Sequence, residues 1–229
     1  MERLQILSAG AAQGVVSALV ERFQADNLGA CAASYGGVHA VWQRVQEASD
    51  LDIVILTGAL MDELITLRQI DPGSRTDLGL VATCLAVRSG EPLPAITSAE
   101  QLRAAFLTST RVVCPNPELA TAGKVLLRVL EQLGISRPMQ ARLEYCDSGA
   151  QTLQMLAAGT GRHELGVAQR PEILGCQTVS LVGSLPGAMH STVMYSAGVA
   201  VQSRRPHLAK IFLQLLTAQP AALLAAGFE

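Results

Sequence analysis

Small residues fill several loops that each follow an apolar segment and precede an amphipathic one. These loops are Ser8-Ala9-Gly10-Ala11-Ala12, Tyr35-Gly36-Gly37-Val38, Leu119-Ala120-Thr121-Ala122-Gly123 and Cys146-Asp147-Ser148-Gly149. The first turn of a helix has backbone N–H groups without intrahelical partners and lies at the positive end of the helix dipole. Any one of these loops is equally typical of a tight turn, but their recurrence favours an anion site built from backbone donors.

A few side chains add specific chemistry to these loops. The guanidinium of Arg170 binds a planar carboxylate through two parallel hydrogen bonds if it faces the site, and is otherwise a solvated surface group. His39 either hydrogen-bonds and relays a proton or packs at a helix start. Lys124 adds positive charge if it faces the loops, although a helix surface is the commoner place for such a lysine. Cys114 and Cys146 are expected at strand ends beside the same loops.

The motifs of several enzyme classes are absent from the sequence. There is no serine triad, no phosphate-binding Walker loop and no helical metal-binding motif, so we expect neither a metal nor a cofactor. Asp147 is the one carboxylate that the sequence places near the small-residue loops. Hydrolysis by a pair of carboxylates is therefore not expected.

Composition excludes two classes of partner. The 229 residues are 49% hydrophobic, which is enough for one large domain or two lobes with cores of their own. Charged residues make up 16% and aromatic residues 3%, with a net charge of −2, so nucleic acid is not an expected partner. No apolar run approaches the roughly 20 residues of a membrane helix, so insertion into a membrane is not expected either.

The cysteines and the amino terminus bear on the compartment. Five cysteines is an odd number, and their spacing fits no zinc site, so we expect buried free thiols in a reducing compartment. No export signal precedes the first apolar segment. The sequence as written therefore predicts a cytoplasmic protein, or a periplasmic one if a signal peptide has been removed.

Strands and helices are expected to alternate along the whole chain, which is typical of α/β folds. The expected strands are 4–7, 30–34, 52–57, 78–87, 111–114, 142–145, 165–168, 176–182 and 191–201. The expected helices are 12–27, 38–48, 61–69, 97–107, 120–133, 149–158 and 205–228. A change to loop composition after residue 88 predicts two lobes, residues 1–85 with 193–229 and residues 86–192.

Four segments carry a more specific pattern. They are Ile6 to Leu19, Asp52 to Gly73, Asn116 to Gly123 and Ala197 to Phe228, with Ile70-Asp71-Pro72-Gly73-Ser74-Arg75 and the closing Gln219-Pro220-Ala221 to Gly227-Phe228 as the most distinctive phrases. In this order they resemble the molybdate-binding protein family of ABC importers. The resemblance implies a two-lobed periplasmic-binding-protein-like fold of type II, with two crossover strands and a ligand captured between the lobes by hinge closure. It also implies a monomer that delivers its ligand to an importer permease.

The resemblance also implies which residues contact the ligand. A serine of the family aligns with Ala11, a second with Val38 or His39, and a ligand tyrosine with Gln169, so the anion here is either a tetrahedral oxyanion or an organic carboxylate. The expected ligand-binding residues are Ser8, Gly10, Ala11, Gly37, Val38, His39, Thr121, Ala122, Ser148, Gly149, Gln169 and Arg170.

An enzyme is the alternative, because aconitate isomerase is a relative on this scaffold. It would isomerise an unsaturated polycarboxylate in the cytosol, and the chemistry needs a base that removes a carbon-bound proton. His39, Cys114 and Cys146 are the candidates for that base, and the sequence does not choose among them.

Overall fold

The computed structural model describes residues 3–229, which form two compact α/β units. Unit 1 contains Met1–Val81 and Val193–Glu229, and unit 2 contains Ala82–Thr192. The chain passes between the units twice, within the strands β4 (Thr76–Arg88) and β9 (Thr192–Val199). The predicted α/β class is confirmed. The predicted boundary at residues 85 and 86 falls within β4 and stays a prediction.

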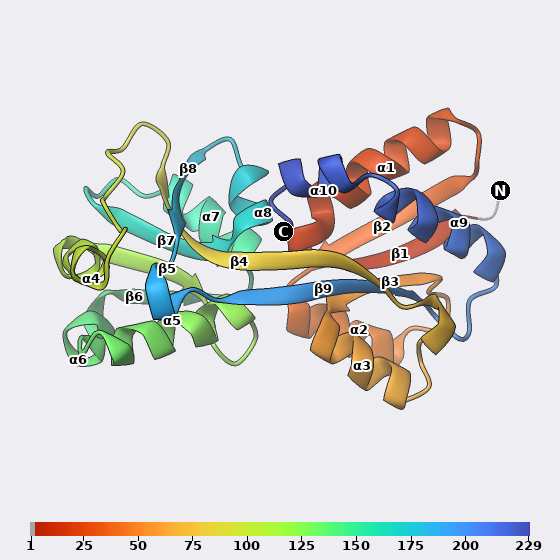
Figure 1. The fold of residues 1–229 in the computed structure, drawn as a ribbon, viewed down its shortest axis with the longest axis horizontal. Coiled ribbons are helices and arrows are strands. Elements are labelled where there is room, and N and C mark those ends of the chain that lie inside the picture. The colour runs from red at the N-terminus through yellow and green to blue at the C-terminus, as the bar shows by residue number, and fades with distance from the viewer. Residues whose placement is uncertain (1–2) are drawn as a thin grey trace. The chain divides into compact units, whose positions relative to one another are not determined.

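Unit 1 is a sheet in the order β2-β1-β3-β9 with helices on both faces (Figure 1). Strands β1 to β3 are parallel to one another and β9 is antiparallel to β3. Figure 1 shows α1, α9 and α10 on one face and α2 and α3 on the other. The elements are β1 (Arg3–Ala9), α1 (Gln13–Ala25), β2 (Ala30–Gly36), α2 (Val38–Glu47), β3 (Ile53–Thr57), α3 (Gly58–Thr66), α9 (Pro206–Thr217) and α10 (Pro220–Ala225), with 3₁₀ helices η1 (Gly10–Ala12) and η2 (Pro72–Ser74).

The buried strand β3 explains why helices cover both faces of this sheet. All five of its residues are buried, as in the parallel strands of a doubly covered sheet. Next to it, the buried carboxylate of Asp52 accepts hydrogen bonds from Gln5 N at 2.8 Å, Ser203 Oγ at 2.6 Å and Arg205 Nη1 at 3.1 Å. This network joins β1 to the segment that follows β9, so it fixes two distant parts of the chain.

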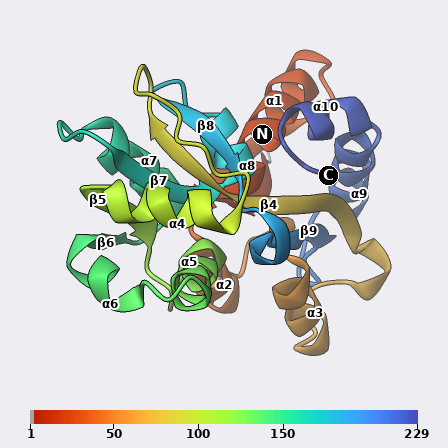
Figure 2. The same ribbon diagram turned by 60° about the vertical axis from the view of Figure 1, so that its left-hand side comes forward.

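Unit 2 pairs β4 with β7 and continues through β5 to β6, while β8 pairs with the other side of β4. Strands β5, β6 and β7 are parallel, and β4 is antiparallel to β7 and β8. Figure 2 brings this unit forward. Its elements are α4 (Ala99–Thr108), β5 (Arg111–Pro115), α5 (Thr121–Gln132), α6 (Ser136–Met139), β6 (Leu143–Cys146), α7 (Gly149–Ala157), β7 (Glu164–Gln169), α8 (Arg170–Leu174) and β8 (Val179–Ser184), with η3 (Gln140–Arg142) and η4 (Gly187–Met189).

Alternation along β4 divides the core of unit 2 into two layers. Leu85 and Val87 pack in a cluster with the apolar faces of α4 and α5. Cys84 and Ala86 point to the opposite face and pack in a cluster with α7 and α8. Successive residues of a strand face opposite sides of the sheet, so one strand contributes to both layers.

Three sequence-based expectations about elements need correction. The segment 205–228 is two helices, because Pro220 has no N–H to donate and the chain breaks at Ala218-Gln219. The short helices α6 and α8 were not predicted, since four and five residues are too few to show a helical period. The strand expected from residue 176 begins at Val179, after a turn.

The five cysteines are free, as predicted, but they are not all buried. Cys84, Cys114 and Cys146 are buried, whereas Cys31 and Cys176 are partly exposed. Within residues 3–229, no helix combines the length and apolar character that crossing a lipid bilayer requires.

Candidate functional site

In unit 1 the structure brings two of the predicted loops together. Strands β1 and β2 run in parallel with Ala9 opposite Gly36, so residues 8–12 and 36–39 leave the same edge of the sheet. Ser8 lies inside β1, is fully buried and donates to Ala9 O at 3.0 Å. Gly10 is partly exposed in η1, and the side chain of Ala11 is buried. This edge therefore presents backbone rather than a serine hydroxyl.

The helices of unit 1 begin at this edge without a side-chain cap. Ala12 precedes α1 and Gly37 precedes α2, and neither provides a side chain that accepts from the first turn. Val38 and His39 are the first two residues of α2, both partly exposed. The His39 ring stacks on Trp42 at a centroid distance of 6.3 Å. Uncapped first-turn N–H groups are the donors that an anion uses.

Unit 2 repeats the arrangement at the carboxyl edge of β5, β6 and β7. In the parallel register Pro115 lies opposite Cys146, so the loops that lead into α5 and α7 leave the sheet side by side. Thr121 and Ala122 open α5, whose preceding residue Ala120 provides no side-chain cap. Lys124 is exposed on the surface of α5.

Close approach at the start of α5 requires glycine. A Cβ on Gly123 would lie 2.8 Å from Pro117 N and closer still to the carbonyl oxygen of Pro115. Both neighbours are backbone atoms, which cannot turn aside as a side chain can. Gly123 therefore fixes how tightly the first turn of α5 packs on the end of β5.

The start of α7 is capped by its own side chains. Ser148 is the N-cap, and its Oγ accepts from Gln151 N at 3.2 Å, while Gln151 Oε1 accepts from Asp147 N at 2.9 Å. The pattern differs from a capping box in that Gln151 accepts from Asp147, the residue before the N-cap, and not from Ser148 itself. The Ser148 hydroxyl oxygen is thus already used by the helix, and the next residue, Gly149, is buried.

A further carboxylate, not predicted from the sequence, lies at this edge. Glu172 on α8 packs its carboxyl oxygens against Gly149, the first residue of α7. The prediction that Asp147 is the one carboxylate near these loops is therefore wrong. The pattern Gln169 to Glu172, three residues apart at a strand end, was the signal that could have found it. Burial raises the pKa of Glu172 to about 7, and the hydrogen bond from Gln169 N works in the opposite direction.

Gln169 and Arg170 lie where β7 ends and α8 begins. Gln169 is 5% exposed and is the N-cap of α8, where it forms a capping box with Glu172, whose carboxyl group accepts from Gln169 N at 3.1 Å. Arg170 is the first residue of α8 and is partly exposed. The structure thus brings Thr121, Ala122, Ser148, Gly149, Gln169 and Arg170 to one edge of unit 2. Their contact with a ligand stays a prediction.

The two cysteine candidates are poor bases. Burial raises the pKa of Cys114 to about 12, and burial also raises the pKa of Cys146. The Cys146 Sγ lies 2.9 Å from Thr152 Oγ1, inside unit 2. A thiol with a raised pKa stays protonated at neutral pH, so both cysteines are poorly suited to remove a proton from carbon.

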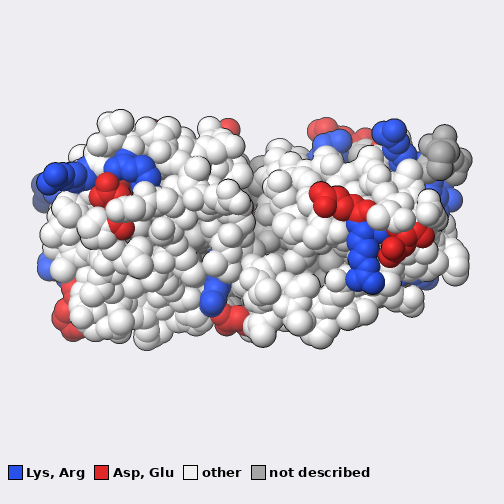
Figure 3. Space-filling model, turned by 90° about the horizontal axis from the view of Figure 1, so that it is seen from above, with Lys and Arg blue, Asp and Glu red and all other residues white. Residues whose placement is uncertain are grey.

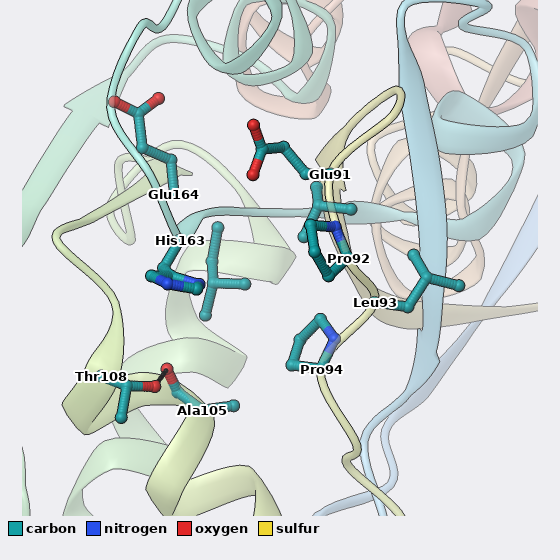
Figure 4. Close-up of a pocket in the computed structure, with 10 residues that line it drawn as sticks. Glu91, Pro92, Leu93, Pro94, Ala105, Thr108, His163 and Glu164 are labelled. Carbon is teal, nitrogen blue, oxygen red and sulfur yellow. Dashed lines mark hydrogen bonds between the residues drawn. The ribbon is translucent and has the colours of Figure 1, made fainter.

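A separate pocket of about 170 Å³ lies at the other end of β7 (Figure 4). His163 faces Pro92 and Pro94 across it, and the carboxylates of Glu91 and Glu164 lie at its rim. Glu91 pairs with Arg88 at 2.7 Å and Glu164 with Arg111 at 3.5 Å. This pocket is acidic and lies at the edge away from the helix starts, so it does not suit an anion.

Charged side chains of both signs are scattered over the surface. Figure 3 shows small groups of both signs, without a basic stripe on the face in view. Among residues 3–229 no cluster of three or more His, Cys, Asp or Glu residues is arranged to hold a metal ion.

The protein has two α/β units that are connected by the chain twice, and in each unit helices begin at the carboxyl edge of parallel strands. These features together are typical of a class of ligand-binding folds. Residues 4–229 match the model of one family, the bacterial extracellular solute-binding proteins, and the chain belongs to that family. Its fold is the two-lobed periplasmic-binding-protein-like type, as the resemblance implied.

Solved structures share the fold at low sequence identity. The periplasmic molybdate-binding protein of Azotobacter vinelandii superimposes with a TM-score of 0.81 at 20% identity, over 99% of each chain. The sulfate-binding protein SubI of Mycobacterium tuberculosis gives a TM-score of 0.77 at 16% identity, over 100% of this chain and 86% of the other. Among curated proteins, aconitate isomerase from a Pseudomonas species is 25% identical over 225 residues, covering 96% of this chain and 84% of the relative.

Proposed function

We propose that this solute-binding protein captures a small anion, either an oxyanion or an organic carboxylate, at helix amino ends. The observation that carries the proposal is that α1, α2 and α5 all begin at a carboxyl edge without a side-chain cap. Helices α7 and α8, at the edge of unit 2, are capped by side chains instead. Uncapped N–H groups at the positive end of a helix are suited to an anion.

Two kinds of relative support an anion as the ligand. Proteins of this fold are named for binding molybdate and sulfate, and the relative at 25% identity is named for an isomerase of a tricarboxylate. Oxyanions and carboxylates share the oxygen acceptors that backbone N–H groups satisfy. Ser8 and Ala11 offer no exposed hydroxyl, so in this proposal the backbone supplies most of the donors.

The proposal extends to transport. Because the family consists of extracellular solute-binding proteins, we place the chain outside the cytoplasm, as a monomer that closes over its ligand and delivers it to an ABC importer permease. Co-purification of the chain with membranes that contain its cognate permease, with and without ligand, tests this partner.

Thermal unfolding with a panel of anions tests capture itself. The panel contains molybdate, sulfate, cis-aconitate and citrate, each with chloride at matched ionic strength as the control. A ligand at 100 times its Kd stabilises the folded state by about 2.7 kcal/mol. For a chain of 229 residues this raises the Tm by about 5–10 °C. If no anion raises the Tm beyond the chloride control, capture of these anions is overturned.

Isomerisation of an unsaturated polycarboxylate is the second candidate function, and the aconitate isomerase relative favours it. With Cys114 and Cys146 protonated, the base would be His39 in unit 1 or Glu172 in unit 2. A base whose pKa is near the working pH is the most effective, which favours Glu172. Incubation with cis-aconitate in heavy water tests this function: deuterium in the recovered acid supports it, and none at any pH between 5 and 9 rejects it.

A further inference from the structure

A groove of about 390 Å³ lies in unit 2, between the edge strand β6 and the helices α5 and α6. Its lining comes from the second half of α5, from α6 and η3, and from β6. Figure 2 shows α6 beside β6 at this end of the sheet, as does Figure 1. The sheet ends at β6, and within residues 3–229 no strand pairs with the outer side of β6. The groove contains none of the predicted ligand-binding residues.

The outer side of β6 presents backbone groups that could pair with a further strand. Asn116 N, just after β5, donates to Cys146 O at 2.7 Å, so the carbonyl group of Cys146 points toward β5. In a parallel pair of strands, the N–H and C=O groups of alternate residues point to the same side. The backbone groups of Leu143 and Tyr145 therefore point away from β5, toward the free edge. A free edge of this kind is a template for an added strand.

The floor of the groove is apolar. Leu143 and Tyr145 are two residues apart on β6, so their side chains lie on the same face of the strand, and both line the groove. Leu127 and Leu130 are three residues apart on α5 and line the groove from the helix. Leu130 is buried, whereas Leu127 and Tyr145 are 38% and 45% exposed. The apolar floor thus continues onto surface that an apolar side chain of a partner can cover.

Arg137 on α6 adds a positive charge beside this apolar floor. Its side chain is exposed, lines the groove and has no hydrogen bond or ion pair within the described part of the chain. On α5, Lys124 lies one turn before Leu127 and Glu131 one turn after it, so their charges offset each other. Glu144 points to the opposite face of β6. The groove is therefore basic on balance, and an acidic group complements it.

We propose that this groove binds an extended peptide segment of a partner protein, which adds a strand to β6. The peptide backbone pairs with the outward N–H and C=O groups of Leu143 and Tyr145. An apolar side chain of the peptide packs on Leu127 and Tyr145, and an acidic side chain next to it pairs with Arg137. In strand addition the main-chain hydrogen bonds provide affinity and the side-chain contacts provide specificity. The proposal uses no residue of the predicted anion site, so it stands or falls separately from the proposed function.

Selection from a library of random short peptides displayed on phage, with the full chain as the target, tests the proposal. The selected peptides are synthesised with a fluorescent label and titrated with the protein, with fluorescence anisotropy as the readout. We expect them to share an acidic residue beside an apolar one and to bind saturably. A library that gives no peptide with saturable binding overturns the proposal.

Three variants locate the binding of the selected peptides. Arg137→Glu reverses the charge in the groove and should weaken binding by about tenfold or more. Arg162→Glu, the same change at an exposed residue outside the groove, is the matched control and should bind like the wild type. Leu127→Gln removes part of the apolar floor but keeps a good helix former, and should weaken binding by about tenfold. All three should keep the circular dichroism of the wild type, and unchanged affinity of Arg137→Glu overturns the proposal.

Methylation of the peptide backbone tests strand pairing without any change to the protein. Alternate N–H groups of an extended peptide point to opposite sides, and only one alternate set can face β6. We expect methyl groups on one set of nitrogens to abolish binding and methyl groups on the other set to be tolerated. Equal effects of the two sets overturn strand addition. A dimer of the chain that Arg137→Glu dissociates, measured by analytical ultracentrifugation, would assign the groove to a second copy and overturn the proposal as well.

Discussion

At the residue scale, three glycines differ in what a side chain would meet. Gly123 and Gly149 have no room for a Cβ, because backbone lies against the first and the Glu172 carboxyl group against the second. Gly14 in the first turn of α1 has nothing within 4 Å of that position. The two crowded glycines lie at the predicted anion edge of unit 2, where helix starts must approach strand ends closely.

Replacing Gly123 by alanine should destabilise the protein by at least about 2 kcal/mol, since the new methyl group meets backbone that must move. Gly14→Ala is the matched control, because it adds the same methyl group to a helix in open space. It should be neutral or stabilising by about 0.5–1 kcal/mol. Denaturant unfolding measures both changes, and equal effects of the two substitutions would contradict the crowding at Gly123.

Glu172 makes a prediction about stability and pH. Its pKa in the folded protein, about 7, lies above the ordinary glutamate value, so the folded state binds more protons than the unfolded state between these values. The contribution of Glu172 to the free energy of unfolding is therefore fully present below the pKa that this side chain has in the unfolded protein. It is lost as the pH rises through 7. Each pKa unit corresponds to about 1.4 kcal/mol.

Glu172→Gln removes this loss. The difference in unfolding free energy between the variant and the wild type should therefore shift in favour of the variant between pH 5 and pH 8. The expected shift is on the order of 2 kcal/mol, allowing for the exposed part of the side chain. Guanidinium unfolding at both pH values measures the difference. A difference between the two proteins that is the same at pH 5 and pH 8 would show that the carboxyl group titrates normally.

At the element scale, helix starts divide into capped and uncapped ones. Ser98 caps α4 by accepting from Gln101 N at 3.3 Å, and Gln101 Oε1 accepts from Thr97 N at 2.9 Å. Helix α4 begins away from the predicted anion edge, whereas α1, α2 and α5 begin at it without such a cap. Helices α7 and α8 also begin at the edge in unit 2 but carry side-chain caps, so the proposed donors are the first-turn N–H groups of α1, α2 and α5.

Ser98→Ala should cost about 1 kcal/mol, because the first turn of α4 loses its acceptor. Ser98→Asp keeps an acceptor of similar reach and adds a favourable charge at the helix start, so it should stay within about 0.5 kcal/mol of the wild type. Thermal unfolding of the three proteins side by side is the measurement. A similar loss in both variants would mean that the serine matters for another reason.

Most elements were predictable from the sequence because their patterns are local. Three local patterns each mark the boundary of an element within a few residues of the observed one. They are the apolar strand that ends at Thr57, the capping pattern around Ser98 and the glycine at residue 134. The break before Pro220 had a local signal as well, which the continuous apolar pattern of residues 205–228 obscured. Helices as short as α8 have too few residues to show a period.

The candidate site was predictable only in part, since contacts between distant segments leave no local pattern. The small-residue loops were found because they are local, and the sheet register brings residues 8–12 beside 36–39 in unit 1. The packing of Glu172 on Gly149 joins residues that are 23 positions apart in the sequence. It depends on α8 lying beside α7, which only the fold reveals.

At the scale of the whole molecule, a negative charge added at one helix start should weaken anion binding without unfolding the protein. His39→Glu places a carboxylate in the first turn of α2, where it should stabilise the helix and repel an anion. Gln24→Glu, an exposed position in the last turn of α1, adds the same charge away from the helix start. Both variants should remain folded by circular dichroism.

Isothermal titration of sulfate, molybdate, cis-aconitate and citrate into these three proteins is the most direct measurement of anion capture. The account predicts saturable binding of one anion per chain to the wild type and to Gln24→Glu, and at least tenfold weaker binding to His39→Glu. Equal affinity of all three proteins, or no saturable binding by the wild type, would contradict capture at the helix amino ends.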